Sequence, residues 1–188
     1  MGRLVGFKGT THLLAASARL GAGHRLAIAG DGPDRLALVA LAAELGIADR
    51  VEFLGRLAPA ELDALRRRST VVVVPALSPE VFGLVGPEAL VLGVPVVAYR
   101  VGGTAHWIER AAPLAHGVTV GDLDGLVAAL GHVLDERIEP AARARVARDL
   151  GEQLSPRRHA ERLMAVFSEA VAAVRGAPQQ ALAGARAN

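Results

Sequence analysis

The sequence has no cysteine, a single lysine and few aromatic residues. The lack of cysteine excludes a disulfide framework and a thiolate metal site, and it is typical of proteins in a reducing compartment. Aromatic residues make up 3% of the chain although 52% of it is hydrophobic, so the core must consist of Ala, Val and Leu. Such a core suits helices packed on a sheet of β-branched strands. The composition therefore favours an α/β fold.

Long apolar runs are also missing. The first residues, MGRLVGFKGTTHLLAA, lack the apolar region and cleavage site of a signal peptide, and no apolar run is long enough to span a bilayer. We therefore expect a cytoplasmic protein without a transmembrane segment. The net charge of +2 does not predict a nucleic-acid partner. A chain of 188 residues is long enough for one domain with a sizeable core.

The one lysine, Lys8, stands among 21 basic residues that are otherwise all arginine. Chance can leave one lysine in such a chain. The alternative, which we favour, is a position that needs a compact and strongly hydrated ammonium group, because a guanidinium is larger and planar.

Strand and helix patterns alternate along the chain, with the spacing of parallel crossover units. The expected strands cover residues 24–30, 50–55, 70–76, 94–99 and 116–120. The expected helices cover residues 9–21, 34–46, 59–69, 86–93, 122–135, 139–153 and 156–174. This order predicts a Rossmann-like doubly wound parallel sheet in one domain, residues 1–175. Residues 176–188 have no apolar period, and we expect them to form a disordered tail.

The start of this pattern is unusual. A doubly wound sheet normally begins with a strand that lies in its middle, but only residues 1–5 precede the first expected helix. Either these residues form a short remnant of the strand, or the sheet has a gap that another segment must fill. An unpaired edge in the middle of a sheet leaves backbone donors and acceptors without partners. We therefore expect a second protein chain or a homo-oligomer to cover the missing strand.

The loops that follow the strands carry the candidate site, because ligands of open α/β sheets bind beyond the carboxyl ends of the strands. Arg3 and Lys8 precede the first helix, and glycines occur at 83, 86, 102 and 103. Glycines allow backbone N–H groups to approach an anion, and the two basic side chains add charge, so the combination fits a diphosphate.

Two carboxylates lie in the same loops. Glu88 suits a ribose, since a carboxylate can accept hydrogen bonds from two vicinal hydroxyls. The alternative is that Glu88, directly behind Pro87, only interacts with the N-terminal end of its helix. For Glu80, taken alone, the alternative is a solvated loop acid.

The run SPEVFGLVGPEAL, followed by GVPVVAYRVGGT, resembles the donor-binding half of retaining glycosyltransferases of the GT-B fold. These belong to the large family 4 group, also called glycosyl transferases group 1. The family signature has a Glu, a Phe-Gly pair, a second Glu eight positions after the first, and then Gly-x-Pro-Val-Val and Gly-Gly. The segments GRLVGFKG, AIAGDGP and RVEFLGRL are similar to elements upstream of that signature. The resemblance covers roughly residues 2–135.

This resemblance implies a C-terminal-type domain that binds a nucleoside diphosphate sugar as donor substrate, with no metal or other bound cofactor for the chemistry. It implies catalytic roles for three residues: Arg3 and Lys8 contact the donor diphosphate, and Glu80 binds hydroxyls of the transferred sugar. It implies that Glu88 holds the ribose. The further donor-binding residues it implies are Phe82, Gly83, Leu84, Val85, Gly55, Arg56, Leu57 and Gly30.

The sequence also departs from the family. The N-terminal domain that binds the acceptor is absent, as is most of the first donor-domain strand. Ala105 and His106 replace the usual Pro-Glu after the Gly-Gly pair, and Ala76 replaces a Ser. Two hypotheses therefore stay open. The chain is the donor half of a glycosyltransferase, inactive without a separate acceptor-binding chain or domain, or it is a non-catalytic binder of nucleotides or nucleotide sugars. A dinucleotide oxidoreductase is weaker, because AGDGPDR lacks the third glycine of that fingerprint.

Overall fold

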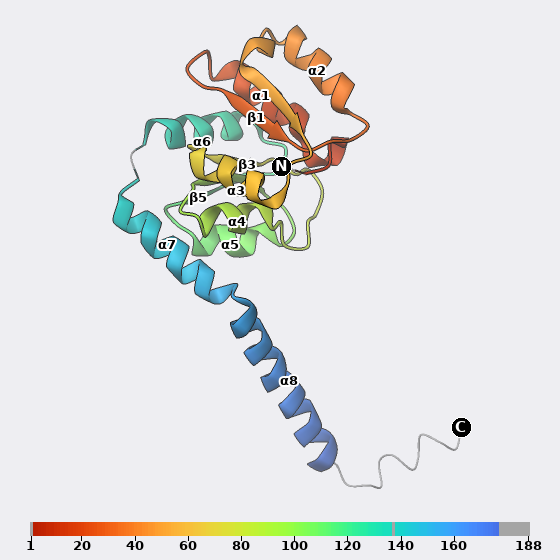
Figure 1. The fold of residues 1–188 in the computed structure, drawn as a ribbon, viewed down its shortest axis with the longest axis vertical. Helices are drawn as coiled ribbons and strands as arrows, with labels where there is room; N and C mark the ends of the chain where they lie inside the picture. The colour runs from red at the N-terminus through yellow and green to blue at the C-terminus, as the bar shows by residue number, and fades with distance from the viewer. Residues whose placement is uncertain (1, 137, 177–188) are drawn as a thin grey trace, which may run out of the picture. The chain divides into compact units, whose positions relative to one another are not determined.

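The computed structural model describes residues 2–136 and 138–176. The chain divides into two compact units, Met1–Leu150 and Gly151–Asn188, which are described separately. Unit 1 alternates strands and helices in the order expected from the sequence (Figure 1). Its strands are β1 (Leu26–Ala29), β2 (Val51–Gly55), β3 (Val72–Val74), β4 (Val96–Arg100) and β5 (Ala115–Thr119).

The helices of unit 1 follow the expected pattern with one addition, α5. They are α1 (Thr10–Arg19), α2 (Arg35–Glu44), α3 (Pro59–Arg68), α4 (Val85–Leu90), α5 (Thr104–Arg110), α6 (Leu123–Asp135) and the start of α7 (Pro140–Gln153). Two short 3-10 helices, η1 (Gly6–Lys8) and η2 (Ala48–Arg50), precede α1 and β2. The sequence did not predict α5, whose buried residues Thr104, Trp107 and Ile108 are too few to show a clear helical period in a sequence without a Pro at its start.

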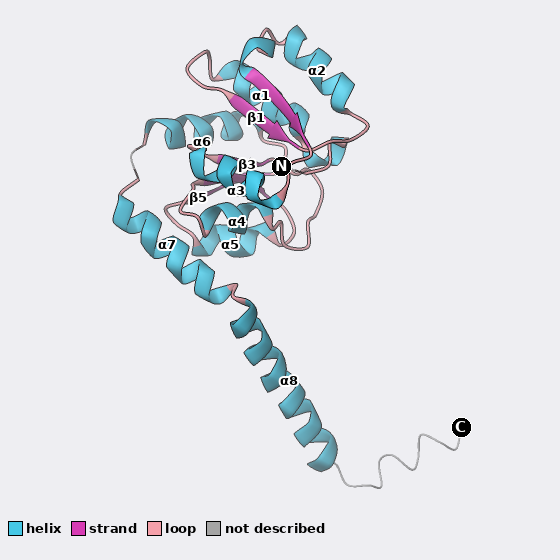
Figure 2. Ribbon diagram, in the orientation of Figure 1, coloured by secondary structure: helices cyan, strands magenta, loops and turns pink. Residues whose placement is uncertain are grey.

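All strand pairs are parallel, which confirms the α/β class. The strands form two sheets, one of order β1-β2 and one of order β3-β4-β5 (Figure 2). β1 and β3 are therefore edge strands in the described part of the chain, although they would be inner strands of a complete doubly wound sheet.

Helices cover both faces of the three-stranded sheet. One apolar cluster joins β3 and β4 to α4, α5 and α7, and it includes Leu90, Val96 and Trp107. A second cluster, on the opposite face, joins Val97 and Tyr99 of β4 to α1 and α6. Because side chains alternate across a strand, consecutive β4 residues enter different clusters, and β4 is buried on both faces.

The two sheets are joined by α1. Its Leu14 packs in a third cluster with Ile28 of β1 and Leu38 of α2. Its Ala16 packs in the cluster of β4 and α6. The single helix α1 thus holds the β1-β2 sheet beside the β3-β4-β5 sheet.

Unit 2 contains the end of α7 and the helix α8 (Pro156–Gly176), which agrees with the helix expected at 156–174. Large apolar side chains of α8 are exposed, among them Met164 and Phe167. The expected tail lies outside the described residues except for Gly176, which ends α8. Among the residues that the structure describes, no helix is long and apolar enough to cross a membrane.

Candidate functional site

The loop after β3 and the segment before α1 lie against each other. The backbone N–H of Leu77 donates to the carbonyl of Phe7 at 2.8 Å. Gly9, at φ 69°, comes so close to the β3 loop that a Cβ there would lie 1.8 Å from the carbonyl oxygen of Pro75. Only glycine fits this backbone conformation and this space. The contact brings the basic segment of residues 3–8 to the carboxyl end of β3.

At this contact Lys8 forms an ion pair with Glu80, between Lys8 Nζ and Glu80 Oε1. The two side chains are 35% and 19% exposed, so both can still reach a ligand. Arg3 is exposed and lines the same cavity as Lys8, Glu80 and Val85. The structure thus brings Lys8 into contact with Glu80, and Arg3 and Val85 line the same cavity.

The loop that carries Glu80 is fixed from behind by the loop after β4. The backbone N–H of Gly103 donates to the carbonyl of Glu80 at 2.8 Å. A Cβ on Gly103 would lie 1.9 Å from the carbonyl oxygen of Val81, and one on Gly102 would lie 2.4 Å from that of Glu80. The Gly-Gly pair therefore makes room for protein backbone, whereas the sequence suggested that it makes room for an anion.

The sole tryptophan holds the other end of this loop. Trp107 Nε1 of α5 donates to the carbonyl of Phe82 at 2.7 Å, and its side chain is 1% exposed. A Cβ on Gly86 would lie 2.4 Å from the ring. Gly86 is thus a close-packing position at the start of α4, and Trp107 is a natural reporter of the loop.

Four consecutive backbone N–H groups next to Glu80 are free. Within the described residues, those of Phe82, Gly83, Leu84 and Val85 donate no hydrogen bond to the protein. A Cβ on Gly83 would lie 3.2 Å from Glu80 Oε2, so the Glu80 carboxylate lies beside this row of donors. Free N–H groups with an ammonium group nearby can bind an oxyanion.

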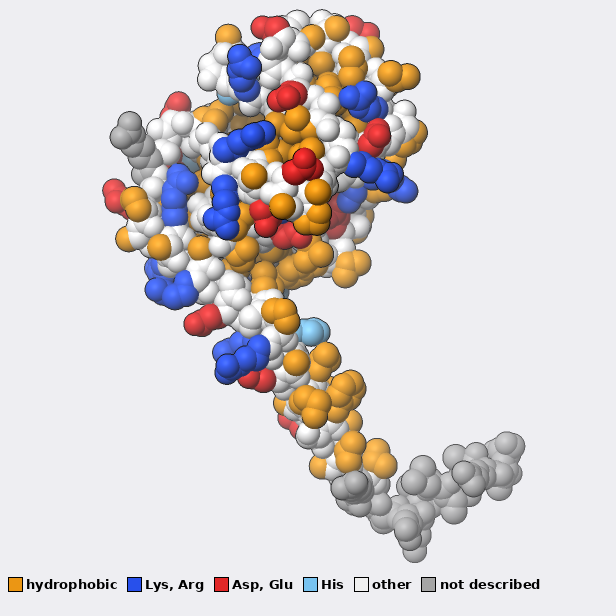
Figure 3. Space-filling view, viewed as in Figure 1, with side chains coloured by type: hydrophobic (Ala, Val, Ile, Leu, Met, Phe, Trp, Pro, Cys, Tyr) orange, Lys and Arg blue, Asp and Glu red, His pale blue; other side chains and the backbone are white. Residues whose placement is uncertain are grey.

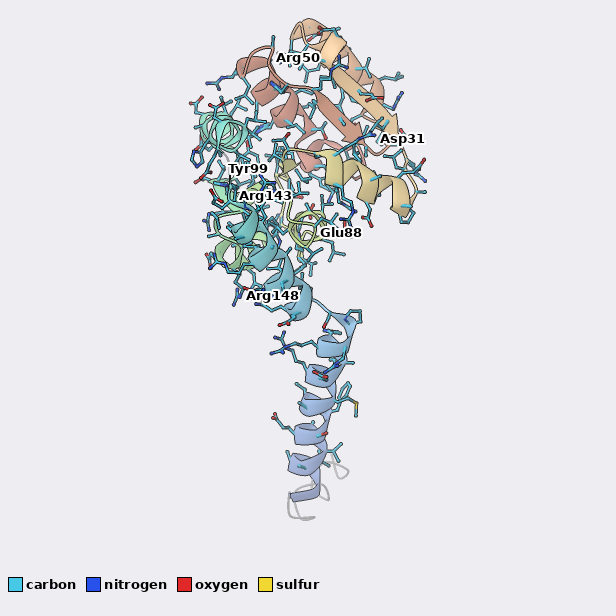
Figure 4. The ribbon with its side chains drawn as sticks, turned by 60° about the vertical axis from the view of Figure 1, so that its left-hand side comes forward. Asp31, Arg50, Glu88, Tyr99, Arg143 and Arg148 are labelled. Carbon is cyan, nitrogen blue, oxygen red and sulfur yellow. The ribbon has the colours of Figure 1, made fainter. Side chains whose placement is uncertain are left out.

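Glu88 has a partner that the sequence analysis missed. Arg66 of α3 forms ion pairs with Glu88 and, at 2.7 Å, with Asp63. Arg66 is 6% exposed, whereas the Glu88 side chain is 46% exposed and lies beside α3 (Figure 4). The helical period contained a signal for this contact, since Arg66 falls on the apolar stripe of Leu62 and Leu65.

The remaining predicted residues are Gly55, which ends β2, and Gly30, Arg56 and Leu57, which come directly after β1 and β2. The backbone N–H of Gly30 donates to the carbonyl of Gly55 at 2.7 Å, and Arg56 is exposed. Neither these residues nor Glu88 line the cavity of Lys8 and Glu80. Among the described residues, no group of three or more His, Cys, Asp or Glu side chains could hold a metal ion.

Comparison with known proteins gives consistent results. The sequence profile of the family "Glycosyl transferases group 1" matches residues 1–149. A D-inositol 3-phosphate glycosyltransferase of Mycolicibacterium smegmatis is 37% identical over 91% of this chain and 39% of its own length. An MMP alpha-(1->4)-mannosyltransferase of Mycolicibacterium hassiacum is 34% identical over 90% of this chain and 42% of its own.

A solved structure has the same fold. Anabaena Alr3699/HepE in complex with UDP superposes with a TM-score of 0.80 at 22% identity, over 89% of this chain and 48% of that chain. Its complex with UDP-glucose gives a TM-score of 0.79 at 23% identity, over 89% of this chain and 48% of that one. The chain thus spans less than half the length of these relatives.

Proposed function

The chain belongs to the glycosyl transferases group 1 family, and we propose that unit 1 is the donor half of a retaining glycosyltransferase. In this proposal it binds a nucleoside diphosphate sugar. The observation that carries the proposal is the Lys8–Glu80 ion pair beside four free backbone N–H groups. The UDP and UDP-glucose complexes of the Anabaena protein make uridine diphosphate the first ligand to test.

Donor binding in this proposal exchanges one ion pair for two contacts. The diphosphate takes Lys8 from Glu80, and Arg3 and the N–H groups of Phe82, Gly83, Leu84 and Val85 complete its binding. The released Glu80 carboxylate then accepts hydrogen bonds from hydroxyls of the sugar. Without ligand, the charges of Lys8 and Glu80 neutralise each other. A ligand that carries both a diphosphate and hydroxyl groups offers a new partner to each of these two side chains.

Glu88 holds the ribose hydroxyls in the proposed complex, and Arg66 positions it. The fork of Arg66 is occupied by Asp63 and Glu88, which limits the conformations of the Glu88 carboxylate. One carboxylate oxygen of Glu88 contacts Arg66. The other oxygen can accept hydrogen bonds from the two hydroxyls of a diol. The nucleotide base lies near Gly55, Arg56 and Leu57.

The proposed reaction breaks the bond between the anomeric carbon and the β-phosphate oxygen and forms a bond from that carbon to an acceptor hydroxyl oxygen. The hydroxyl proton passes to the leaving diphosphate, and the anomeric configuration is retained. Lys8, Arg3 and the backbone N–H groups stabilise the negative charge of the leaving group. The acceptor site belongs to a separate chain or domain, so the described chain alone binds the donor without transferring its sugar.

The test is calorimetric titration of the full chain with UDP and UDP-glucose, with Trp107 fluorescence as a second readout. Replacing Lys8 with Met should weaken the binding of both ligands. Glu80→Gln should weaken UDP-glucose binding but spare or strengthen UDP binding, because it frees Lys8. The loss of one charged hydrogen bond corresponds to about 1.5–3 kcal/mol. Glu109→Gln, an exposed carboxylate on α5, is the control.

Equal losses for both ligands in Glu80→Gln would contradict the role of Glu80. No binding of UDP or of any other common nucleoside diphosphate would overturn the proposal. Sugar transfer that appears only after a separate acceptor-binding protein is added favours a split enzyme over a non-catalytic binder.

A further inference from the structure

The carbonyl groups of the loop that carries Glu80 are held by hydrogen bonds from the protein. We call residues 80–85 the site loop. Backbone N–H groups donate to three of its carbonyls over 2.8–3.2 Å, in the pairs Gly103–Glu80, Gly86–Gly83 and Glu88–Leu84. The carbonyl of Phe82 accepts instead from a side chain, Trp107 Nε1, at 2.7 Å. Of these four contacts, the one from Trp107 is therefore the one that a side-chain replacement removes.

The hydrogen bond from Trp107 also sets the direction of a neighbouring N–H group. The peptide between Phe82 and Gly83 is trans, and in a trans peptide the carbonyl and the next N–H point in opposite directions. Trp107 holds the Phe82 carbonyl toward α5, so the N–H of Gly83 is directed away from α5. Within the described residues, this N–H is one of the four in the site loop that donate no hydrogen bond to the protein.

The backbone of Gly83 does not fix this orientation by itself. Gly83 has a φ of 70°, and glycine adopts φ of either sign about equally well. The peptide before it can therefore rotate unless a partner holds its carbonyl. The hydrogen bond from Trp107 selects one of the orientations that glycine allows at this position.

Trp107 is a rigid donor. Its side chain is 1% exposed and packs in the apolar cluster of Leu90 and Val96. Gly86 leaves room for the indole, because a Cβ there would lie 2.4 Å from the ring. A group that packing already holds loses little further conformational freedom when a ligand binds. The direction of the Gly83 N–H is therefore set before a ligand arrives.

The surface charge of the chain does not supply this direction. The net charge is +2, and Figure 3 shows Lys and Arg side chains interspersed with Asp and Glu on one face of unit 1. Without ligand, Glu80 also neutralises Lys8. Binding of a diphosphate in such surroundings depends on individual donors that point at its oxygens.

We propose that Trp107 is a positioning residue of the diphosphate site: by holding the Phe82 carbonyl, it directs the Gly83 N–H to a phosphate oxygen of the donor. This inference rests on the proposed donor binding. The two hydrogen bonds share one peptide unit, and hydrogen bonds linked in this way polarise and strengthen one another. An anion on the Gly83 N–H therefore strengthens the bond from Trp107, and loss of that bond weakens anion binding.

The first measurement uses the unchanged full chain. Trp107 is the sole tryptophan, so an NMR spectrum of nitrogen-bound protons contains a single indole N–H signal. UDP should move this signal downfield, because the indole hydrogen bond becomes stronger. Uridine, which has the base and the ribose but no phosphate, should leave the signal in place. An indole signal that does not move when UDP binds would overturn the inference.

The second measurement removes the donor and keeps the ring. Because the chain has one tryptophan, benzothienylalanine can replace it, and the sulfur of this analogue takes the place of the indole N–H. UDP should bind about fivefold more weakly, while the affinity for uridine stays the same. Trp107→Phe also lacks the donor and should show the same difference between the two ligands.

Tyr99→Phe is the matched control. Tyr99 is 0% exposed, and its hydroxyl bonds to His12 at 2.9 Å. The variant therefore loses a buried hydrogen bond of the same sheet that does not hold the site loop. Its affinity for UDP should stay unchanged.

The possible outcomes separate this inference from the proposed function. A loss of affinity for UDP alone supports the positioning role of Trp107. Equal losses for UDP and uridine would overturn it in favour of a structural role, and so would an unchanged affinity for UDP without the indole N–H. If the unchanged chain binds no nucleoside diphosphate, the proposed donor site fails and this inference fails with it. UDP binding without any effect at Trp107 overturns the inference alone.

Discussion

Strands β1 and β4 have similar apolar sequences, Leu-Ala-Ile-Ala and Val-Val-Ala-Tyr, but different neighbours. β4 pairs with β3 and β5, and its residues 96–99 are all 0% exposed. β1 pairs with β2, and Ala27 in its middle is exposed. The comparison shows that an apolar strand sequence does not ensure burial. Ile28 of β1 packs against α1 and α2 and is 4% exposed, whereas its neighbour Ala27 is exposed, so burial depends on what packs against each residue.

The candidate site lies between these two regions. Glu80 belongs to a loop that Gly103 and Trp107 fix to the complete β3-β4-β5 sheet. Lys8 follows the N-terminal segment, which pairs with the end of β1. Their ion pair therefore links the β3-β4-β5 region to the β1-β2 region. The predictions below compare the stability of these two regions.

The largest difference should come from matched leucine truncations. Leu114, before β5, is 0% exposed, and Leu114→Ala should cost about 2–5 kcal/mol of unfolding free energy through the cavity it leaves. Leu26 of β1 is only half-buried and lines the cavity of Lys8 and Glu80, so Leu26→Ala should cost about 1 kcal/mol, near the average for single substitutions. Urea unfolding measures both values. Equal costs would show that the β1-β2 region is as well packed as the β3-β5 region.

A smaller effect is expected from Gly86→Ala, which tests the packing of the site loop. The added Cβ would lie 2.4 Å from the ring of Trp107, and such overpacking costs about 1–3 kcal/mol. The tryptophan emission should shift to the red as the ring loses its close environment. Gly151→Ala, where a Cβ meets nothing within 4 Å, is the control and should be neutral or slightly stabilising in its helix. An unchanged emission in Gly86→Ala would contradict the contact.

The smallest effect concerns pH and compares one histidine from each region. Burial lowers the pKa of His116 of β5, and His132 lowers it further. Burial also lowers the pKa of His24, which lines the cavity of Lys8 and Glu80, and the positive charge of Arg50 lowers it further. Since the folded-state pKa of each lies below the unfolded value of 6.5, the unfolded state binds more protons in acid. Their stabilisation is therefore complete above pH 6.5 and is lost as the pH falls through the folded-state values.

Unfolding free energies measured across this pH range check the effect. His116→Gln and His24→Gln should each reduce the loss of stability on acidification. His159→Gln, an exposed position on α8, should leave the pH dependence unchanged. If the unfolding free energy falls as much on acidification in His116→Gln and His24→Gln as in the unchanged chain, these two histidines do not cause the fall.

The sequence predicted most of the secondary structure, because strand and helix periods in unit 1 are regular and end at glycines. It did not predict α5, which is stabilised by contacts that are remote in sequence, such as that of Trp107 with Phe82. The sequence also suggested that Gly102 and Gly103 make room for a ligand. A glycine in a sequence does not show whether protein backbone or a ligand comes close to it. Arg66 was missed because its partner Glu88 is 22 residues away.

The amino-acid sequence by itself determined the α/β class, the order of the elements and the family, because these depend on local periods and on the spacing of motifs. Only the tertiary structure determined that Lys8 pairs with Glu80, that Arg66 holds Glu88, and that Gly102 and Gly103 make room for protein backbone. The physical reason is that each of these features depends on contacts between segments distant in the chain. Hydrogen bonds and ion pairs between such segments form only when the chain packs, so no local pattern encodes them.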